Sequence, residues 1–221
     1  MKSYQLLNFI SPKFIFSCFV VLLLNACEQK TQTLPILGER DAVTRTVNGK
    51  EVTDTVYHQI PDYAFLDQDS VLITPKTFAG KVYVADFFFT TCPTICPKMK
   101  TQMLRIFEKY KNNPKVNLLS HSIDPTYDNV GVLRAFAKHL GVNDTKVWHF
   151  VTGDRNKIYE IGQKGYMVTA QEDKTAPGGQ LHDGSFLLID TQRRVRGRYD
   201  GTIPAEVDKL MNDIELLLQE K

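Results

Sequence analysis

An apolar run that leads directly into two closely spaced cysteines constrains this chain more than any other stretch. Residues 82–89 are almost entirely apolar, as in a central strand that is covered on both faces. Cys92 and Cys96 follow at once, and Pro97 opens a segment with helical periodicity that reaches about residue 110. The pattern predicts two thiols at the point where a buried strand gives way to a helix.

Two prolines decide how the thiols are presented. Pro93 biases Cys92 away from helical backbone angles, and Pro97 does the same to Cys96. We therefore expect Cys92 in a loop and Cys96 near the helix N-terminus, where unpaired N–H groups favour thiolates. Thiolates are the nucleophiles of disulfide exchange and also ligands for soft metals such as Cu(I), so the pair alone leaves both chemistries open.

A short apolar segment near the N-terminus indicates export. Residues 14–26 carry no charge, and the run is too short for a membrane-spanning helix of about 20 residues but suits a signal peptide. It ends in Leu24-Asn25-Ala26-Cys27, which looks like a bacterial lipobox. We predict that residues 1–26 are a lipoprotein-type signal cleaved before Cys27, which would carry lipid. A plain signal peptide or an uncleaved anchor is the alternative.

Export would isolate the cysteine pair. The signal would remove Cys18 and lipid would occupy Cys27, so that only Cys92 and Cys96 remain as free thiols. A disulfide across so short a loop removes little chain entropy and would be a poor structural staple, which favours a chemical role. The net charge of only +2 argues against a nucleic-acid binder.

The rest of the chain divides into a tether and one domain. Residues 27–57 are polar without sustained period and are expected to hold the domain off the membrane, with a strand-like piece near residues 44–56. Residues 58–221 are expected to form the domain. Within it we predict a hairpin at 65–73, further strands at 116–123, 147–151, 186–189 and 195–199, and helices at 97–110, 129–140, 156–162 and from 204.

Strands that alternate with helices indicate a three-layer α/β domain. Residues 168–183, rich in Gly, Pro and charge, are expected to form a loop. Four arginines on the last hairpin form a basic tip, which is either a docking surface for an acidic partner or a solvated turn: Arg193, Arg194, Arg196 and Arg198.

A third ligand would separate metal binding from redox chemistry, because two thiolates under-coordinate a copper or zinc ion and imidazole is the natural supplement. His182 lies just before a strand that can neighbour residues 82–89, so its loop would run past the cysteines. On pattern alone, His182 is either a ligand or an ordinary loop residue. Core or surface positions are the interpretation for the other four histidines: His58, His121, His139 and His149.

Several motifs over about residues 58–220 resemble, in order, those of the Sco/SenC family of membrane-tethered copper-binding proteins. They are Gly80-Lys81, residues 88–97, Ser122-Ile123-Asp124-Pro125, Trp148-His149-Phe150 with Thr152-Gly153, and His182 before residues 186–190. The resemblance implies a thioredoxin-like α/β/α domain with a central mixed sheet.

The resemblance also implies that Cys92, Cys96 and His182 bind one copper ion, as Cu(I) or Cu(II), and that the two cysteines can form a redox disulfide. Such a protein assists assembly of the binuclear copper centre of cytochrome c oxidase by donating the ion, reducing the recipient cysteines, or both. Its partner would be the copper-bearing subunit or another copper or thiol protein. Asp124 falls on an acidic position of the family, where it either supports the site or caps a turn.

Two comparisons with ordinary thioredoxins point in opposite directions. Thioredoxins carry a cis-proline where this chain has His182-Asp183-Gly184-Ser185, and its absence here favours metal binding. Asp86 lies six residues before Cys92, where thioredoxins carry a buried acid that assists proton transfer. A buried carboxyl has a raised pKa and can act as a base, or Asp86 is simply hydrogen-bonded within the sheet.

The leading hypothesis is a lipid-anchored copper metallochaperone, not an enzyme, that faces outward from the cytoplasmic membrane on the periplasmic side. The alternatives are an exported thiol–disulfide oxidoreductase, a thiol peroxidase of similar fold, and a lipoprotein whose disulfide is structural. Stoichiometric copper binding that depends on His182 would distinguish the first from the others.

Overall fold

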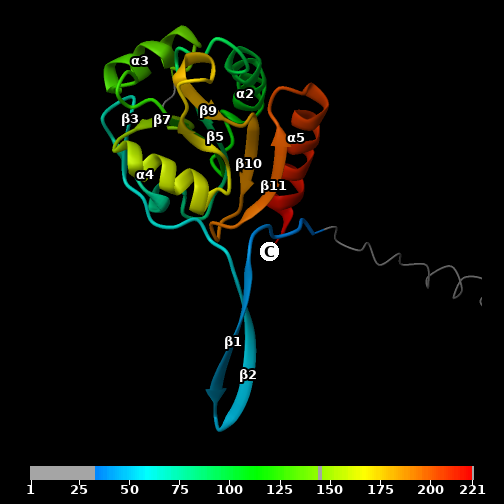
Figure 1. Ribbon diagram of the computed structural model, residues 1–221. Helices are drawn as coiled ribbons and strands as arrows, with labels where there is room; N and C mark the ends of the chain where they lie inside the picture. Colours follow the sequence, from blue (N-terminus) through cyan, green and yellow to red (C-terminus); the bar gives the residue numbers. More distant parts are fainter. Residues whose placement is uncertain (1–32, 144–145, 221) are drawn as a thin grey trace, which may run out of the picture. The chain divides into compact units, whose positions relative to one another are not determined.

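The computed structural model describes residues 33–143 and 146–220 (Figure 1). The predicted signal peptide and the lipid-bearing Cys27 lie outside these ranges. Within the described residues, no helix combines the length and the apolar character needed to cross a membrane.

A mixed seven-stranded sheet forms the centre of the domain. The strand order is β11-β10-β5-β6-β7-β3-β4, with β5, β6 and β7 parallel and the flanking pairs antiparallel. The strands are β3 (Phe65–Asp67), β4 (Leu72–Ile73), β5 (Val82–Phe88), β6 (Val116–Ser122), β7 (Trp148–Thr152), β10 (Ser185–Ile189) and β11 (Val195–Asp200).

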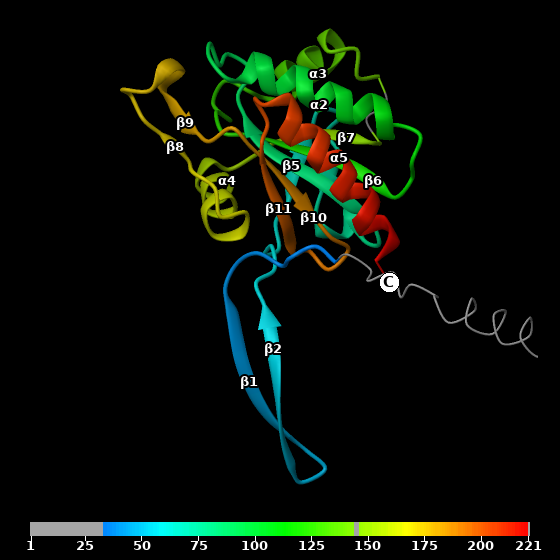
Figure 2. The same ribbon diagram turned by 90° about the vertical axis from the view of Figure 1, so that its right-hand side faces the viewer.

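Helices cover both faces of this sheet (Figures 1 and 2). One face carries α2 (Cys96–Tyr110), α3 (Val130–His139) and α5 (Pro204–Gln219); the other carries α4 (Arg155–Glu160) and the π-helical turn η2 (Ile161–Gly165). A 3-10 turn, η1 (Pro75–Phe78), precedes β5. The predicted three-layer α/β arrangement with a mixed sheet is confirmed.

The central strand shows why its sequence is so apolar. Phe88 stacks on Phe136 of α3 at 5.3 Å between ring centroids, on the face that α2, α3 and α5 cover. Its neighbour Phe87 points to the opposite face, where it stacks on His121 at 4.8 Å and contacts Tyr166. Because both faces of β5 are buried, every residue from Val82 to Phe88 is inaccessible, and alternation of polar and apolar residues is absent.

Two stretches hold more regular structure than the sequence indicated. The predicted 168–183 loop contains β8 (Ala170–Glu172), a 3-10 turn η3 (Pro177–Gly179) and β9 (Gln180–His182). Three-residue strands are too short for their period to show in the sequence.

The predicted polar tether likewise contains an antiparallel pair, β1 (Arg40–Val47) and β2 (Lys50–Tyr57). Asn48 and Gly49 join these strands with φ angles of 52° and 76°. Asn-Gly is the preferred pair for a two-residue hairpin turn with positive φ, so this pair in the sequence indicates the hairpin.

The basic tip predicted on the last hairpin is not a free positive surface. Each of its four arginines forms an ion pair with a carboxylate, at N–O distances between 2.5 and 3.2 Å: Arg193 with Asp62, Arg194 with Asp190, Arg196 with Asp190 and Glu220, and Arg198 with Asp183. Asp190 lies in the turn of the same hairpin, whereas Asp62 and Glu220 lie outside it, so the sequence of the hairpin could reveal only part of the pairing.

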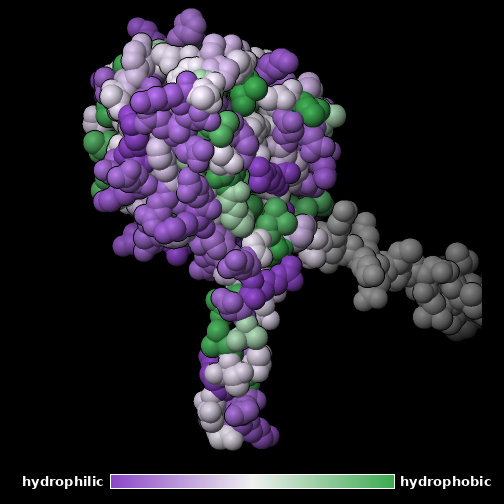
Figure 3. Space-filling model, viewed as in Figure 1, coloured by the Kyte–Doolittle hydropathy of each residue, from purple (hydrophilic) through white to green (hydrophobic). Residues whose placement is uncertain are grey.

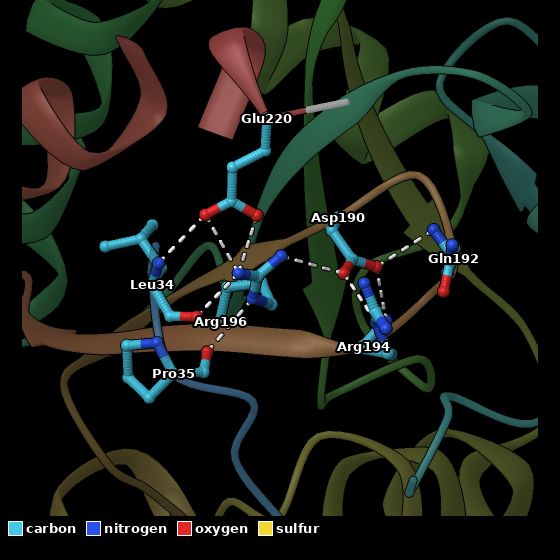
Figure 4. A network of polar contacts seen from close by, with 7 residues as sticks. All are labelled: Leu34, Pro35, Asp190, Gln192, Arg194, Arg196 and Glu220. Carbon is cyan, nitrogen blue, oxygen red and sulfur yellow. Dashed lines mark hydrogen bonds and ion pairs between the residues drawn. The ribbon is translucent and has the colours of Figure 1, made fainter. Parts of the chain in front are cut away.

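Arg196 is the most buried of the four, and it joins three segments (Figure 4). It donates to the carbonyls of Leu34 and Pro35 at 2.6 and 3.0 Å, and it pairs with Asp190 and with Glu220 just after α5. The Leu34 N–H donates to the same Glu220 carboxylate at 2.8 Å. The segment that leads to the hairpin is thus fastened to the domain by a buried charge network.

Candidate metal centre

The structure places the two thiols as the prolines predicted. β5 ends at Phe88, and the Cys92 N–H donates to the Phe89 carbonyl at 3.2 Å within the following turn. Cys96 is the first residue of α2, with Pro97 in the first helical turn. Both thiols are free and buried.

His182 reaches the thiols because of the strand order. β10 runs antiparallel to β5 with Leu187 opposite Ala85, so the chain that enters β10 lies at the carboxyl end of β5. His182 ends β9, three residues before β10, and its ring packs edge-on against Phe89 at 5.7 Å. The predicted approach of this segment to the cysteines is confirmed.

Three donor atoms converge at this point. The Nε2 atom of His182 lies 3.4 Å from the Cys96 sulfur and 3.9 Å from the Cys92 sulfur. All three donor atoms lie within 4.8 Å of one another, and all three residues are buried. Within the described residues, this is the one group of His, Cys, Asp or Glu donors found with metal-site spacing, so neither Asp86 nor Asp124 belongs to it.

The imidazole is held in the tautomer that a metal ligand needs. Its Nδ1 lies 3.1 Å from the carbonyl oxygen of Asp183. A carbonyl only accepts hydrogen bonds, so Nδ1 carries the proton and donates. Nε2 then faces the two sulfurs, an arrangement typical of metal-binding histidines: with a proton it donates to a thiolate, and without one its lone pair can bind a metal ion.

Arg198 and Asp183 form a support for this histidine that the sequence did not reveal. Arg198, on β11, donates to the Asp183 carboxylate at 2.8 Å and to the Ser185 hydroxyl at 2.8 Å. Asp183 also accepts from the Ser185 N–H at 3.0 Å. The network fixes the backbone whose carbonyl orients His182.

A second support holds the loop that carries Cys92. Asp128 is fully buried and accepts from the Thr90 N–H at 3.0 Å and the Ser122 hydroxyl at 2.6 Å. Burial raises its pKa, while these hydrogen bonds oppose the rise. The described hydrogen bonds of Asp124 are made by its backbone, including a 3.2 Å bond from its N–H to Ser122, and the charge of its carboxylate raises the pKa of Asp128. Asp128, which the sequence did not single out, is thus the acid that holds this loop.

A glycine lets the ribbon of β8 and β9 close over the site. Gly178, in η3, has a φ of 79°, and a Cβ atom there would lie 2.7 Å from the Phe89 ring and 3.4 Å from Pro93. A side chain would therefore be strained by the backbone and would collide with the aromatic residue that packs on His182.

The donor set fits a soft metal ion. Two cysteine sulfurs and one imidazole are the ligands that Cu(I) and zinc prefer. Donor atoms bonded to one transition-metal ion at about 2.0–2.3 Å lie roughly 3–4.5 Å apart. The two sulfur–nitrogen distances of 3.4 and 3.9 Å fall within this range. The site therefore needs little rearrangement to hold such an ion.

The family model described as SCO1/SenC matches residues 51–219, which is most of the chain. The chain belongs to the SCO1/SenC family. The "SCO1 protein homolog" of Bacillus subtilis is 28% identical over 172 residues, covering 76% of this chain and 86% of that protein.

Solved structures of Sco proteins share the fold. BsSco, described as "a member of the Sco family of cytochrome c oxidase assembly proteins", superposes with a TM-score of 0.67 at 24% identity, covering 86% of this chain and all of that one. Arabidopsis thaliana ScoI, solved with copper bound, gives a TM-score of 0.59 at 21% identity, covering 72% and 98%. These likenesses establish the thioredoxin-like fold of the family for this chain.

In this Sco-family chain the two thiols differ in acidity. Burial by itself would raise the pKa of Cys92, but hydrogen bonds from His182, Thr94 and Cys96 lower it to about 6. Deeper burial raises the pKa of Cys96, and the neighbouring Cys92 raises it further. Cys92 is therefore the thiolate at neutral pH, while Cys96 keeps its proton.

Asp86 belongs to the surroundings of the site although it is not one of the donor group. Burial raises its pKa to about 7, although the 2.5 Å hydrogen bond from the Ser120 hydroxyl and the charge of His182 oppose this rise. Its carboxyl and Cys96 line one small cavity, and its negative charge raises the pKa of Cys96. The predicted hydrogen bond within the sheet is confirmed, and the carboxylate is also coupled to a thiol, while its role in proton transfer stays a prediction.

We expect alkylation of the reduced protein by iodoacetamide to follow the Cys92 thiolate. The rate should rise as the pH increases through about 6 and level off above it, since the thiolate forms above its pKa. In His182→Gln the lost hydrogen bond should move this midpoint upward and slow labelling at pH 7. The exposed His139 provides the control, as His139→Gln should leave the profile unchanged. A midpoint above 8 in the unmutated protein would contradict the assignment.

Proposed function

We propose that this chain is a copper metallochaperone that carries one copper ion, as Cu(I) or Cu(II), on Cys92, Cys96 and His182. The observation that carries the proposal is the convergence of two free thiols and one imidazole, whose Nε2 lies 3.4 and 3.9 Å from the sulfurs. Copper is the cargo in this proposal. The copper-bound structure of the Arabidopsis relative and the family membership support the choice of metal.

The surroundings of the site suit a cargo that must leave again. Cys92 and His182 retain 8% and 9% of their accessible surface, whereas Cys96 retains 1%. Thr91, Pro93 and Thr94, on either side of Cys92, are exposed. A partner's thiol or imidazole could therefore approach from the Cys92 side while Cys96 still holds the ion. We infer that Cys92 is the first ligand to be exchanged.

We propose that the recipient is the copper-bearing subunit of cytochrome c oxidase, and that the protein assists assembly of the binuclear copper centre of that enzyme. BsSco is described as belonging to a family of cytochrome c oxidase assembly proteins. A lipid on Cys27 would keep the domain at the outer surface of the cytoplasmic membrane, and the residues between Cys27 and Leu34 would link the two, because Arg196 fastens Leu34 to the domain. The lipobox-like sequence before Cys27 supports this location.

Cys27→Ser should then release the protein from the membrane fraction, and unchanged membrane retention would contradict the anchor.

Titration of the reduced protein with Cu(I) under anaerobic conditions should saturate at one ion per chain. His182→Ala should weaken binding by more than the roughly 10–100-fold typical of losing a residue that only orients a ligand. Cys92→Ser and Cys96→Ser should weaken it at least as much, because a hydroxyl is a poor ligand for a soft ion. Competition against a chelator of known affinity measures each constant.

His139→Ala is the matched control for this titration, since His139 is exposed at the end of α3. It should bind one ion with unchanged affinity. Equal affinity of the His182→Ala protein and the control would remove His182 from the site. Absence of stoichiometric binding in the unmutated protein would overturn the proposed function.

The acidity of Cys92 favours a second function, reduction of the partner's cysteines. The Cys92 thiolate would attack a partner disulfide, and Cys96 would then resolve the mixed disulfide. The partner gains two electrons and two protons, of which Cys96 releases one and solvent supplies the other, and this chain ends with a Cys92–Cys96 disulfide. The raised pKa of Cys96 requires a proton acceptor for the second step, and Asp86 lies beside it.

We expect Asp86→Asn to change the thiols without removing a metal ligand. Loss of the negative charge should lower the pKa of Cys96, stabilise the reduced form and make the disulfide reduction potential less negative. Equilibration with glutathione buffers measures the potential. Asp124→Asn is the matched control, and it should leave the potential unchanged. If both variants kept the potential and the thiol pKa values of the parent protein, Asp86 would have no role in thiol chemistry.

A further inference from the structure

The β1–β2 hairpin is a ribbon without a covering layer. The two strands form a sheet of their own, and Figures 1 and 2 draw it outside the three layers of the domain. All eight residues of β1 are exposed, and β2 has only two half-buried residues. A two-stranded ribbon is only marginally stable in water by itself. Contact between one of its faces and another surface would therefore stabilise it.

The register divides the hairpin into two unlike faces. One face pairs Thr44 with Thr53 through a 3.0 Å hydrogen bond and places Arg40 over the Tyr57 ring. The other face, which we call the valine face, consists of the pairs Asp41/Val56, Val43/Asp54, Arg45/Val52 and Val47/Lys50. The four valines of this face are 38–50% exposed: Val43, Val47, Val52 and Val56.

Apolar residues therefore interrupt the polar surface along the ribbon (Figure 3). Single exposed apolar residues are common on protein surfaces. Four large apolar side chains on one face of a short ribbon instead form a patch, which is typical of an interaction surface.

The charges on the valine face are sorted along its length. Asp41 and Asp54 occupy the half near the domain, and Arg45 and Lys50 occupy the half near the turn. Within one chain, Arg45 and Asp54 form a 2.6 Å ion pair across the middle of the face. The face is therefore acidic at one end and basic at the other, with valines between the charges.

We propose that the valine face binds the valine face of a second copy of this chain, with the two ribbons antiparallel about a two-fold axis. This arrangement places Asp41 beside Lys50 of the partner subunit and Asp54 beside Arg45 of the partner subunit. The same symmetry brings valines of the two copies into diagonal contact. Parallel stacking would instead bring like charges together at every pair, so the charge order selects the antiparallel arrangement.

The contact is small and the association is correspondingly weak. An eight-residue ribbon spans about 27 Å by about 10 Å, or roughly 270 Å² per copy, against about 800 Å² for a standard interface. The pairing therefore depends on a high local concentration, which attachment of both copies to one membrane would supply.

The pairing leaves the metal centre accessible. The Ile60 N–H, just after β2, donates to the Arg193 carbonyl at 2.9 Å, in the turn between β10 and β11. This turn lies at the edge of the sheet where β5 begins, since Ile189 pairs with Tyr83. The candidate metal centre lies at the opposite edge, so two copies could pair while each still exchanges its ion.

Charge variants of the full chain in detergent micelles test the proposal by sedimentation velocity over a range of concentrations at 0.15 M salt. The basic variant is Asp41→Lys with Asp54→Arg, and the acidic variant is Arg45→Asp with Lys50→Glu. The unmutated chain should dimerise with rising concentration. Each variant alone should dimerise at least tenfold more weakly, and an equimolar mixture of the two should regain dimers.

The mixture distinguishes docking from unfolding, because variants whose hairpin had melted would not recover affinity for each other. The control variant, Glu51→Lys with Thr53→Lys and Thr55→Lys, changes the net charge as much as the basic variant does, but on the other face of the hairpin. It should dimerise like the unmutated chain. The N-terminal segment is common to all samples, so it cannot produce differences among them. A monomeric unmutated chain at every concentration, or a mixture that stays as weak as its components, would overturn the proposal.

Discussion

The antiparallel pairing of β10 with β5 is the constraint on which the candidate metal centre depends. The thiols follow the end of β5, and His182 precedes the start of β10, ninety residues away in the chain. Opposite strand directions bring these two points to the same edge of the sheet. The imidazole then reaches the sulfurs without a long flexible loop, so the site is already assembled before an ion arrives.

Burial around this edge controls both chemistries open to the dithiol. Hydrogen bonds to a partly accessible Cys92 lower its pKa, while the deeper Cys96 retains its proton next to Asp86. A metal ion would replace these protons at both sulfurs, whereas disulfide exchange needs one thiolate and one acid. The same asymmetry would therefore suit both of the proposed functions, copper transfer and thiol reduction, and the imidazole beside the sulfurs favours copper.

The orientation of His182 depends on charges that the rest of the fold brings in. Arg198 of β11 fixes Asp183, and the Asp183 carbonyl fixes the proton on Nδ1. Asp128 plays a corresponding part for the Cys92 loop through Thr90 and Ser122. The ligands themselves come from loops and element ends, while two carboxylates, the buried Asp128 and the partly exposed Asp183, hold them in place together with strand residues.

Local chemistry made much of this protein predictable. The apolar run of β5, the positions of Pro93 and Pro97 and the periodicity of the helices follow from steric and burial rules that act over a few residues. The sequence alone therefore determined the layer architecture, the loop-and-helix presentation of the thiols and the set of ligand candidates.

Only the tertiary structure decided what depends on contacts between distant residues. It paired the four arginines of the last hairpin with acids, including Asp62 and Glu220 from outside the hairpin, so that the basic tip is not a free positive surface, and it identified Asp128 as the acid that holds the thiol loop. It also directed Nε2 of His182 at the sulfurs. Such contacts are set by strand order and burial, which a linear pattern does not contain, and the same strand order turned two cysteines and a distant histidine into one site.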